Sequence, residues 1–216
     1  MLEIKIFVVN PLEENCYVVS DETKEAMIID PGMFAEGEWT EVADYIRTER
    51  LNVKHCLLTH THFDHIMGCH SVEKDMGLRP EGHADDVEQY KKLDRQIRDF
   101  FGFPIPVPDL PVFGKCVSDG DIVEFGSHKA VVIHTPGHSK GGVCYYIESE
   151  KVLFTGDTLF SGSMGRTDLQ GGDESQILNS LLKLSRLDGQ TRVYPGHGGI
   201  TNIENEKRWI QAICRR

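Results

Sequence analysis

Four side chains of the kinds that bind metal ions fall within six consecutive positions of this chain. They are His60, His62, Asp64 and His65, and they directly follow the apolar segment 56–58, which is typical of a buried strand. Because a rigid strand positions the loop that follows it, these groups should surround one point. Imidazole and carboxylate together suit Zn²⁺ or another first-row metal better than Mg²⁺ or Ca²⁺. The run therefore predicts a metal site more strongly than a histidine-rich surface loop.

Three later segments share one pattern, in which an apolar or β-branched run is followed by a ligand-type side chain beside a glycine. They are TPGH at 135–138, TGD at 155–157 and YPGH at 194–197. Glycine allows a sharp turn and a close approach of the backbone to a site. Folds of the α/β type place their sites where strands end at a shared sheet edge. We therefore expect His138, Asp157 and His197 to join the histidine run.

The remaining sequence predicts two groups of strands, each followed by helices. Strands are expected at 4–9, 16–19, 26–29, 56–58, 122–125, 130–134, 143–147, 152–155 and 191–194, and helices at 38–50, 66–76, 84–101, 174–186 and 203–214. No internal repeat and no low-complexity linker divides them. This order predicts two similar β-then-α halves that pack together as one domain over residues 1–216.

Composition narrows the classes of function. The chain carries 23 basic and 34 acidic residues, a net charge of −11, which disfavours nucleic-acid and anionic-membrane partners. No apolar run approaches the ~18 residues of a membrane span, and Glu3 and Lys5 interrupt the first segment where a signal peptide would be apolar. Six cysteines without a C-x-x-C pair predict reduced, mostly buried thiols. We expect a cytoplasmic protein with a small-molecule substrate, and the oligomeric state stays open.

The H-x-H-x-D-H run at 60–65, followed in order by His138, Asp157 and His197, resembles the metallo-β-lactamase fold superfamily. The resemblance extends over nearly the whole chain, from NCY at 15–17 and IDPG at 29–32 to PGH at 195–197. Within that superfamily the chain is similar to the glyoxalase II-like hydrolases. The resemblance implies an α/β fold (α+β in some schemes), a four-layer αββα sandwich with two sheets face to face and helices outside.

Carried over residue by residue, the resemblance also implies two divalent metal ions, with Zn²⁺ favoured over iron or manganese. One ion would be held by His60, His62 and His138, the second by Asp64, His65 and His197, and Asp157 would bridge the pair. Two cations a few ångströms apart repel each other, and a bridging carboxylate with a shared hydroxide screens them. The pair would also lower the pKa of the shared water and supply hydroxide near neutral pH.

This ligand set implies a hydrolase in which metal-bound hydroxide attacks the carbonyl of a thioester or a related acyl substrate. A thiolate leaves without a strong acid, and Asp64 is the only obvious candidate for a catalytic acid besides the bridging Asp157. An alternative is a mononuclear iron enzyme of the persulfide dioxygenase kind, which GRTD at 165–168 resembles; PGHG at 195–198 favours the hydrolase. A binding or scaffold protein without activity would be expected to lack ligands, and none is missing.

Substrate recognition has fewer signals in the sequence. Arg166 follows Asp157 closely, so we expect it either to bind an anionic substrate group or to form a local salt bridge with Asp168. The chain ends at Arg216 without the C-terminal helical extension of glyoxalase II enzymes, which helps to grip glutathione. We therefore expect only a modest preference for the thiol part of a substrate.

Other residues have two interpretations each. Asp30 is expected either to accept a hydrogen bond from a ligand histidine or to serve as a turn former. The phenylalanines at 100, 101 and 103 are expected in the core, or else as an apolar lip over the cleft. The remaining histidines belong to no motif and are expected at the surface or satisfied within the core: His55, His70, His83, His128 and His134.

Overall fold

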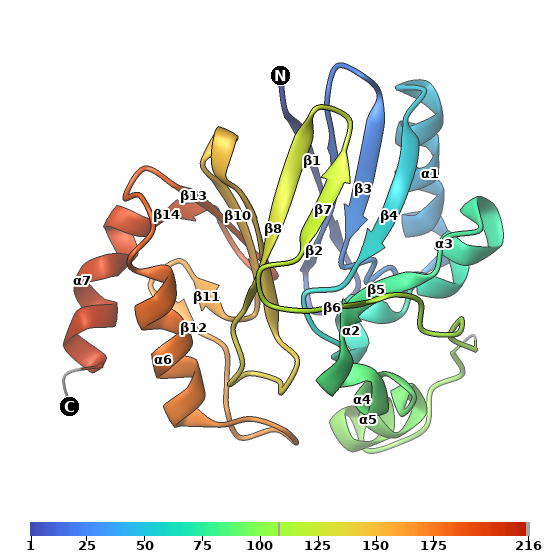
Figure 1. The fold of residues 1–216 in the computed structure, drawn as a ribbon. Coiled ribbons are helices and arrows are strands. Elements are labelled where there is room, and N and C mark those ends of the chain that lie inside the picture. The colour runs from blue at the N-terminus through green and yellow to red at the C-terminus, as the bar shows by residue number, and fades with distance from the viewer. Residues whose placement is uncertain (108, 215–216) are drawn as a thin grey trace.

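Two six-stranded sheets lie face to face, and helices cover their outer faces (Figure 1). The computed structural model describes residues 1–107 and 109–214. The first sheet runs in the order β1 (Glu3–Val9), β2 (Glu14–Ser20), β3 (Glu25–Ile29), β4 (Asn52–Leu57), β5 (Pro80–His83) and β6 (Cys116–Val117). The second runs in the order β14 (Thr201–Asn202), β13 (Arg192–Pro195), β10 (Val152–Gly156), β9 (Val143–Ile147), β8 (His128–His134) and β7 (Ile122–Phe125).

The helices complete the four layers. The outer face of the first sheet carries α1 (Glu36–Thr48) and α3 (Cys69–Met76), and that of the second carries α6 (Glu174–Leu184) and α7 (Ile203–Ile213). The short helices α2 (Phe63–Ile66), α4 (Val87–Tyr90) and α5 (Leu93–Phe101) lie together at one end, and β11 (Leu159–Phe160) pairs with β12 (Ser163–Met164). The architecture confirms the predicted αββα sandwich.

Alternate residues of the central strands pack into different apolar layers. In β2, Cys16 and Val18 pack with the residues of α1, whereas Tyr17 and Val19 lie between the two sheets. In β9, Tyr145 likewise lies between the sheets, and its neighbours on either side pack toward α6 and α7. Successive side chains of a strand point to opposite faces, so a sheet covered on both faces needs apolar residues at nearly every position. The continuous apolar runs in the sequence have this origin.

The predicted elements and the observed ones differ mainly around the ligand run. In place of the helix expected over 66–76, α3 begins only at Cys69, and the separate short helix α2 ends at Ile66. Gly68 lies between them, where an added Cβ would come within 2.7 Å of the Pro31 carbonyl oxygen. The helix expected over 84–101 is a 3₁₀ turn, Ala84–Asp86, followed by α4 and α5. Short strands such as β5 and β6 went unpredicted, because two to four residues paired with a parallel neighbour carry too little apolar pattern.

The cysteines agree with the expectation from composition. All six cysteines are free thiols, and four of them are buried. In the described parts of the chain, no helix combines the length and the apolar character that crossing a bilayer requires.

A polar cluster ties the turn after β2 to the turn before β8. The Asp21 carboxylate accepts a hydrogen bond from the Ser127 amide at 2.7 Å and lies 3.0 Å from Nδ1 of His128. The other ring nitrogen of His128 lies 3.1 Å from Oε1 of Glu150. Burial opposes the charged imidazolium, but the hydrogen bonds to Asp21 and Glu150 outweigh it and raise the pKa of His128. His128 is therefore a satisfied histidine, as expected.

This cluster predicts a pH-dependent contribution to stability. Because the pKa of His128 is higher in the folded chain than its usual ~6.5, its stabilisation is fully present below about pH 6.5 and is lost as the pH rises through the folded value. We expect His128→Gln to lower the free energy of unfolding by about 1–2 kcal/mol at pH 6, and by less at high pH. Urea unfolding of both proteins across this range measures the difference. A difference that stays constant with pH would contradict the assignment.

Candidate metal centre

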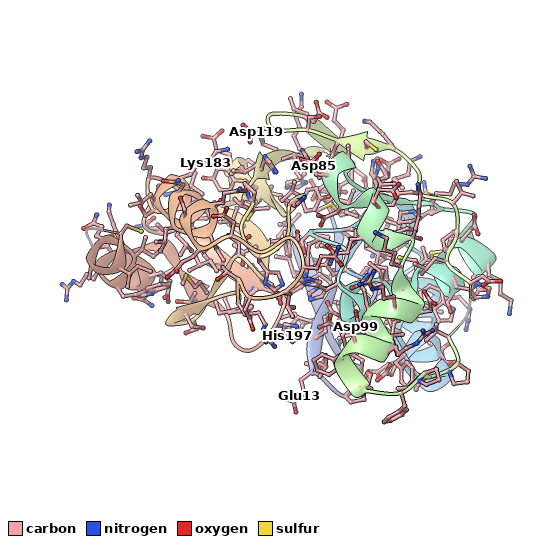
Figure 2. The ribbon with its side chains drawn as sticks, turned by 90° about the horizontal axis from the view of Figure 1, so that it is seen from below. Glu13, Asp85, Asp99, Asp119, Lys183 and His197 are labelled. Atoms are coloured by element: carbon pink, nitrogen blue, oxygen red, sulfur yellow. The ribbon has the colours of Figure 1, made fainter. Side chains whose placement is uncertain are left out.

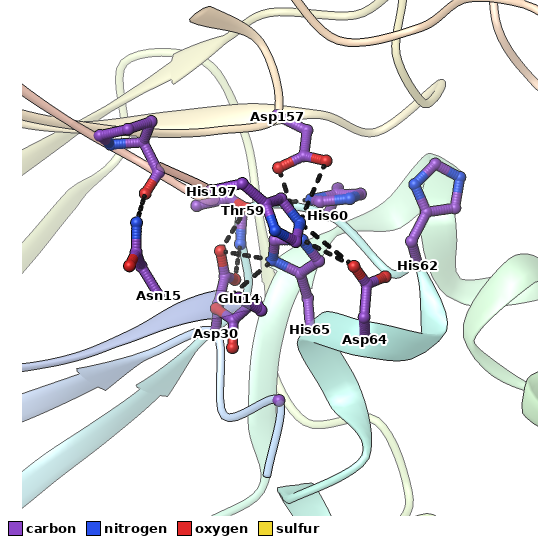
Figure 3. Close-up of polar contacts among 12 residues, drawn as sticks. Glu14, Asn15, Asp30, Thr59, His60, His62, Asp64, His65, Asp157 and His197 are labelled. Carbon is purple, nitrogen blue, oxygen red and sulfur yellow. Dashed lines mark hydrogen bonds and ion pairs between the residues drawn. The ribbon is translucent and has the colours of Figure 1, made fainter. Parts of the chain in front are cut away.

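Seven ligand-type side chains meet at one end of the space between the sheets. Figure 3 labels all of them except His138. The histidine run follows β4, and the three other ligands follow strands of the second sheet. His138 lies in the loop after β8, Asp157 follows β10, and His197 follows β13. The structure thus brings together all seven residues that the sequence proposed as ligands, at the exits of four strands.

The seven side chains form two groups with one carboxylate between them. The ligand atoms of His60, His62 and His138 lie within 4.8 Å of one another, and so do those of Asp64, His65 and His197. Asp157 contacts both groups: its Oδ2 lies 3.4 Å from Nε2 of His138, and its Oδ1 lies 3.5 Å from Nε2 of His65. Asp157 therefore lies between the two groups, the position that a bridging carboxylate would need.

Several of these polar atoms are buried without a hydrogen-bond partner, namely Nε2 of His60, Nε2 of His65 and Oδ1 of Asp157. A buried polar atom left unpaired costs about 1–3 kcal/mol, so a native structure provides such atoms with partners. A cation accepts lone pairs from imidazole nitrogen and carboxylate oxygen alike. The donor set therefore fits a pair of transition-metal ions, the chemistry that the sequence predicted.

The protonation states of His60, His62 and Asp64 favour cation binding. Burial and the neighbouring imidazoles hold the pKa of His60 well below its usual value, and burial with His138 does the same for His62. Both rings are neutral near pH 7, which is the form that binds a metal. Burial opposes the charge on Asp64, but His65 and His197 lower its pKa, so this carboxylate stays ionised. At His65 and His197 burial opposes the charged ring, but the neighbouring carboxylates outweigh it and raise the pKa of both, so an ion bound there displaces protons.

Backbone carbonyls orient two of the imidazoles. His138 donates its Nδ1 proton to the carbonyl oxygen of Arg166 at 2.8 Å, and His197 donates its own to that of Leu12 at 3.0 Å. A carbonyl oxygen only accepts hydrogen bonds, so each ring keeps its proton on Nδ1. Nε2 of each ring then carries the free lone pair, and it lies 3.4 Å (His138) or 3.7 Å (His197) from Oδ2 of Asp157. Nε2 of His138 also lies 2.8 Å from Nδ1 of His62, a neighbour in its own ligand group.

Asp30 supports ligands of both groups. Its Oδ2 lies 3.1 Å from Nδ1 of His65 and accepts a hydrogen bond from the Thr59 hydroxyl at 2.6 Å. The Thr59 oxygen in turn lies 3.1 Å from Nδ1 of His60. The contact with His65 confirms the prediction that Asp30 accepts from a ligand histidine. Its φ of 51° shows that it also forms the turn, so the two interpretations hold together.

The glycine of the YPGH segment allows a close approach at the centre. A Cβ at Gly196 would lie 2.3 Å from Oδ1 of Asp157 and 2.7 Å from Cε1 of His65. No side chain fits in that space without moving a ligand. The glycine beside His197 is therefore needed for proximity, as the pattern of the strand ends predicted.

The loop that carries His197 is anchored by residues whose role the sequence alone did not reveal. Asn15 donates from Nδ2 to the carbonyl oxygens of Pro195 and Gly198, both at 3.0 Å, and the Tyr17 hydroxyl donates to Pro195 at 2.6 Å. The only signal was the place of NCY at 15–17 in the family resemblance. These bonds join the start of β2 to the end of β13 across the two sheets.

Two buried carboxylates near the centre were also missed. Asp86 accepts hydrogen bonds from Ser139 at 2.8 Å and from the Gly141 amide at 2.6 Å, while its carbonyl accepts from Thr61 at 3.0 Å. It thereby links the loops on either side of the first ligand group. Glu14 is fully buried beside His65, 3.7 Å from its Nδ1, and burial raises the pKa of this carboxyl group. Neither residue belongs to a recognisable local motif.

A cleft of about 460 Å³ opens onto the centre, and its lining includes His62, Asp64, His138 and Asp157. Apolar side chains such as Phe63 and Phe100 line another part of it. The Phe100 ring lies 5.0 Å from that of Phe63 and is 48% exposed. Of the predicted phenylalanines, Phe100 therefore forms an apolar lip, whereas Phe101 packs against the core.

Three cationic side chains line the same cleft: Lys92, Arg95 and Arg166. Arg166 forms a salt bridge with Asp168, in which Nε and Nη2 each lie 2.7 Å from a carboxylate oxygen. Both of its predicted roles are therefore compatible with its position, since the paired side chain also lines the cleft. Lys92 and Arg95 were not identified from the sequence, because nothing in the segment 84–101 indicated which helical face meets the centre.

Comparisons with known proteins agree with this geometry. A family model described as the metallo-beta-lactamase superfamily matches residues 9–197. The hydroxyacylglutathione hydrolase GloC of Haemophilus influenzae is 34% identical over 211 residues, which cover 96% of each chain. The crystal structure of the BLEG-1 B3 metallo-beta-lactamase superposes with a TM-score of 0.86 at 33% identity and covers 96% of this chain and 99% of its own. A crystal structure of TTHA1623 in a di-iron-bound form superposes with a TM-score of 0.82 at 36% identity, covering 94% and 97%.

Proposed function

Because this chain belongs to the metallo-β-lactamase superfamily, we propose that it is a dinuclear metal-dependent hydrolase that cleaves thioesters. The observation that carries the proposal is the position of Asp157, whose two carboxylate oxygens face two complete groups of three ligands. The similarity to a hydroxyacylglutathione hydrolase supports the thioester as the reacting group. A pair of Zn²⁺ ions is our first choice, and the di-iron form of TTHA1623 makes iron the second.

The geometry suggests a role for each residue of the centre. Two bound ions supply Lewis acidity at the carbonyl oxygen and a hydroxide at neutral pH. His60, His62 and His138 would hold one ion, Asp64, His65 and His197 would hold the other, and Asp157 would lie between them. Asp64 also lines the cleft, and its lowered pKa keeps the carboxylate ionised, which suits a metal ligand better than a proton acceptor. The thiolate product is a good leaving group and needs no strong acid.

The alternative is a mononuclear iron oxidoreductase of the persulfide dioxygenase kind. A centre with one iron would leave the second ligand group without a function. In that group Nε2 of His65 is buried without a hydrogen-bond partner, so it would then stay unsatisfied. Metal analysis of the freshly purified protein, combined with a panel of thioesters and an oxygen electrode, separates the two. We expect about two ions per chain and thioester hydrolysis without oxygen uptake. One iron per chain with oxygen consumption on persulfide would overturn the proposal.

The cleft further supports a substrate whose thiol part carries negative charge. Lys92, Arg95 and Arg166 line it although the chain as a whole has a net charge of −11. Arg95 and Arg166 are partly neutralised by Asp99 and Asp168, whereas no described carboxylate forms a salt bridge with Lys92. Lys92 is therefore the cation most available to a carboxylate of the carrier.

This assignment predicts an effect on binding more than on chemistry. We expect Lys92→Glu to raise KM for S-lactoylglutathione about tenfold with kcat changed by less than about twofold, because the charge contacts the carrier in ground and transition state alike. Arg166→Ala should act in the same direction more weakly, since Asp168 already neutralises it. A short neutral thioester with the same acyl group should be unaffected, and Lys91→Glu, outside the cleft lining, is the matched control. Equal losses on both thioesters would contradict the assignment.

A further inference from the structure

Two imidazoles outside the metal centre lie face to face where the two sheets meet. His83 ends β5 of the first sheet and His134 ends β8 of the second, and their ring centroids are 4.2 Å apart at an interplanar angle of 7°. Asp85 adds a carboxylate, with its Oδ2 at 3.7 Å from Nδ1 of His83. The sequence placed both histidines among those without a partner, and the fold brings them together.

We propose that His83, Asp85 and His134 form a further binding site for a first-row transition-metal ion such as Zn²⁺. Their ligand atoms lie within 4.8 Å of one another. Nitrogen and oxygen ligands bind Zn²⁺ at about 2.0–2.2 Å, so bound ligand atoms are roughly 3–4 Å apart and the group must close by about 1 Å. The Asp85 side chain is 60% exposed and is free to make that movement. Nδ1 of His83 accepts a hydrogen bond from the Asp85 amide at 3.3 Å, so binding would exchange this contact for the ion. A rotation of the His83 ring about its broad χ2 torsion would let the in-plane lone pairs of the two rings converge.

A backbone carbonyl sets the tautomer of His134. Its Nε2 lies 3.1 Å from the carbonyl oxygen of Lys140. Since that oxygen only accepts, Nε2 donates its proton and Nδ1 keeps a free lone pair. His138 and His197 are held by carbonyls in the same way at the metal centre. This support is typical of histidines that bind metals.

The charges around the imidazole pair favour a cation. Besides Asp85, the Asp119 carboxylate accepts a hydrogen bond from the His134 amide at 2.7 Å, and Lys183 lies 2.8 Å from the same oxygen. The two exposed carboxylates of Asp85 and Asp119 thus outnumber the single ammonium group, that of Lys183, near the two imidazoles. In Figure 2, Asp85 and Asp119 lie on one side of the molecule, apart from His197 at the metal centre and Asp99 at the cleft. An ion here would join β5 to β8 and would stabilise the sandwich without taking part in hydrolysis.

The test counts ions and measures stability on the full chain. After saturation with Zn²⁺ and removal of the free metal, we expect about three ions per wild-type chain and about two in the His83→Asn/His134→Asn double variant, with the metal centre still filled. Added Zn²⁺ at about a hundred times its Kd should raise Tm of the wild type by about 5 °C more than that of the double variant. His55→Asn is the matched control, because His55 pairs with Glu81 and has no second imidazole beside it.

A second variant keeps the proposal testable if the double variant does not fold. Asp85→Ala changes an exposed side chain, and we expect it to weaken binding of the third ion about tenfold while melting normally in EDTA. The site does not depend on the proposed activity, so Asp157→Ala should keep this ion after it loses the others. Two ions per wild-type chain, or a third ion that survives both the double variant and Asp85→Ala, would overturn the proposal.

Discussion

Replacing Asp157 with alanine is expected to remove most of the bound metal from both halves of the metal centre at once. The carboxylate faces His138 through Oδ2 at 3.4 Å and His65 through Oδ1 at 3.5 Å, so each half would lose a ligand. The two cations would also lose the negative charge that screens their repulsion. Elemental analysis after dialysis should find a small fraction of the wild-type content at the centre, and thioester hydrolysis should fall by at least about a thousandfold.

The control for this variant lies further along the chain, after β12. Asp168 is also a carboxylate, but it is exposed and pairs with Arg166, so Asp168→Ala should keep both ions. Circular dichroism of Asp157→Ala separates loss of metal from loss of fold. If the folded variant kept two ions at the centre, Asp157 would not be the bridge between the two ligand groups.

His197→Ala is expected to act on one half alone. Its Nε2 lies 3.2 Å from Oδ2 of Asp64 in the second group, while His60, His62 and His138 make no use of it. The first group should therefore keep its ion with near-normal affinity, and the second should empty. We expect hydrolysis to fall by at least about a hundredfold, because one of the two ions that activate the nucleophile is lost.

Metal titration and kinetics together test this selectivity. The variant should bind one ion at the centre with wild-type affinity, and adding excess metal should restore little activity. His70→Ala is a suitable control, because His70 contacts the Asp109 carbonyl and lies outside both ligand groups. Wild-type activity with a single ion in His197→Ala would favour a mononuclear mechanism instead.

Local pattern was sufficient to find the candidate ligands. His60, His62, Asp64 and His65 are conspicuous because metal-binding residue types crowd the exit of a buried strand. His138 and His197 are conspicuous because a glycine precedes each at the end of another strand. These features depend on residues adjacent in the chain, and such features are visible without coordinates. The same holds for the long strands, whose apolar residues face two cores in alternation.

The local pattern did not reveal which of these residues belong to the same group, because that depends on the path of the backbone. His62 has an extended conformation, with φ of −66° and ψ of 150°, and α2 begins at the next residue. Asp64 and His65 therefore lie on a helical turn that faces His197, although they adjoin His62 in the sequence. The sequence reached this division only through the family resemblance.

Apart from Asp30, the residues that support the site could be identified only from the tertiary structure. Asp86 joins the loops that carry Thr61 and Ser139, and His83 meets His134 across the two sheets. Each of these contacts links segments far apart in the chain, and none of the partners has a local pattern that marks it. The sequence by itself determined which side chains can bind metal and which strands present them. The contacts that hold those side chains in place were decided only by the packing of one sheet against the other. Their partners are far apart in the chain and follow no common sequence pattern, so they become neighbours only when the two halves of the fold pack together.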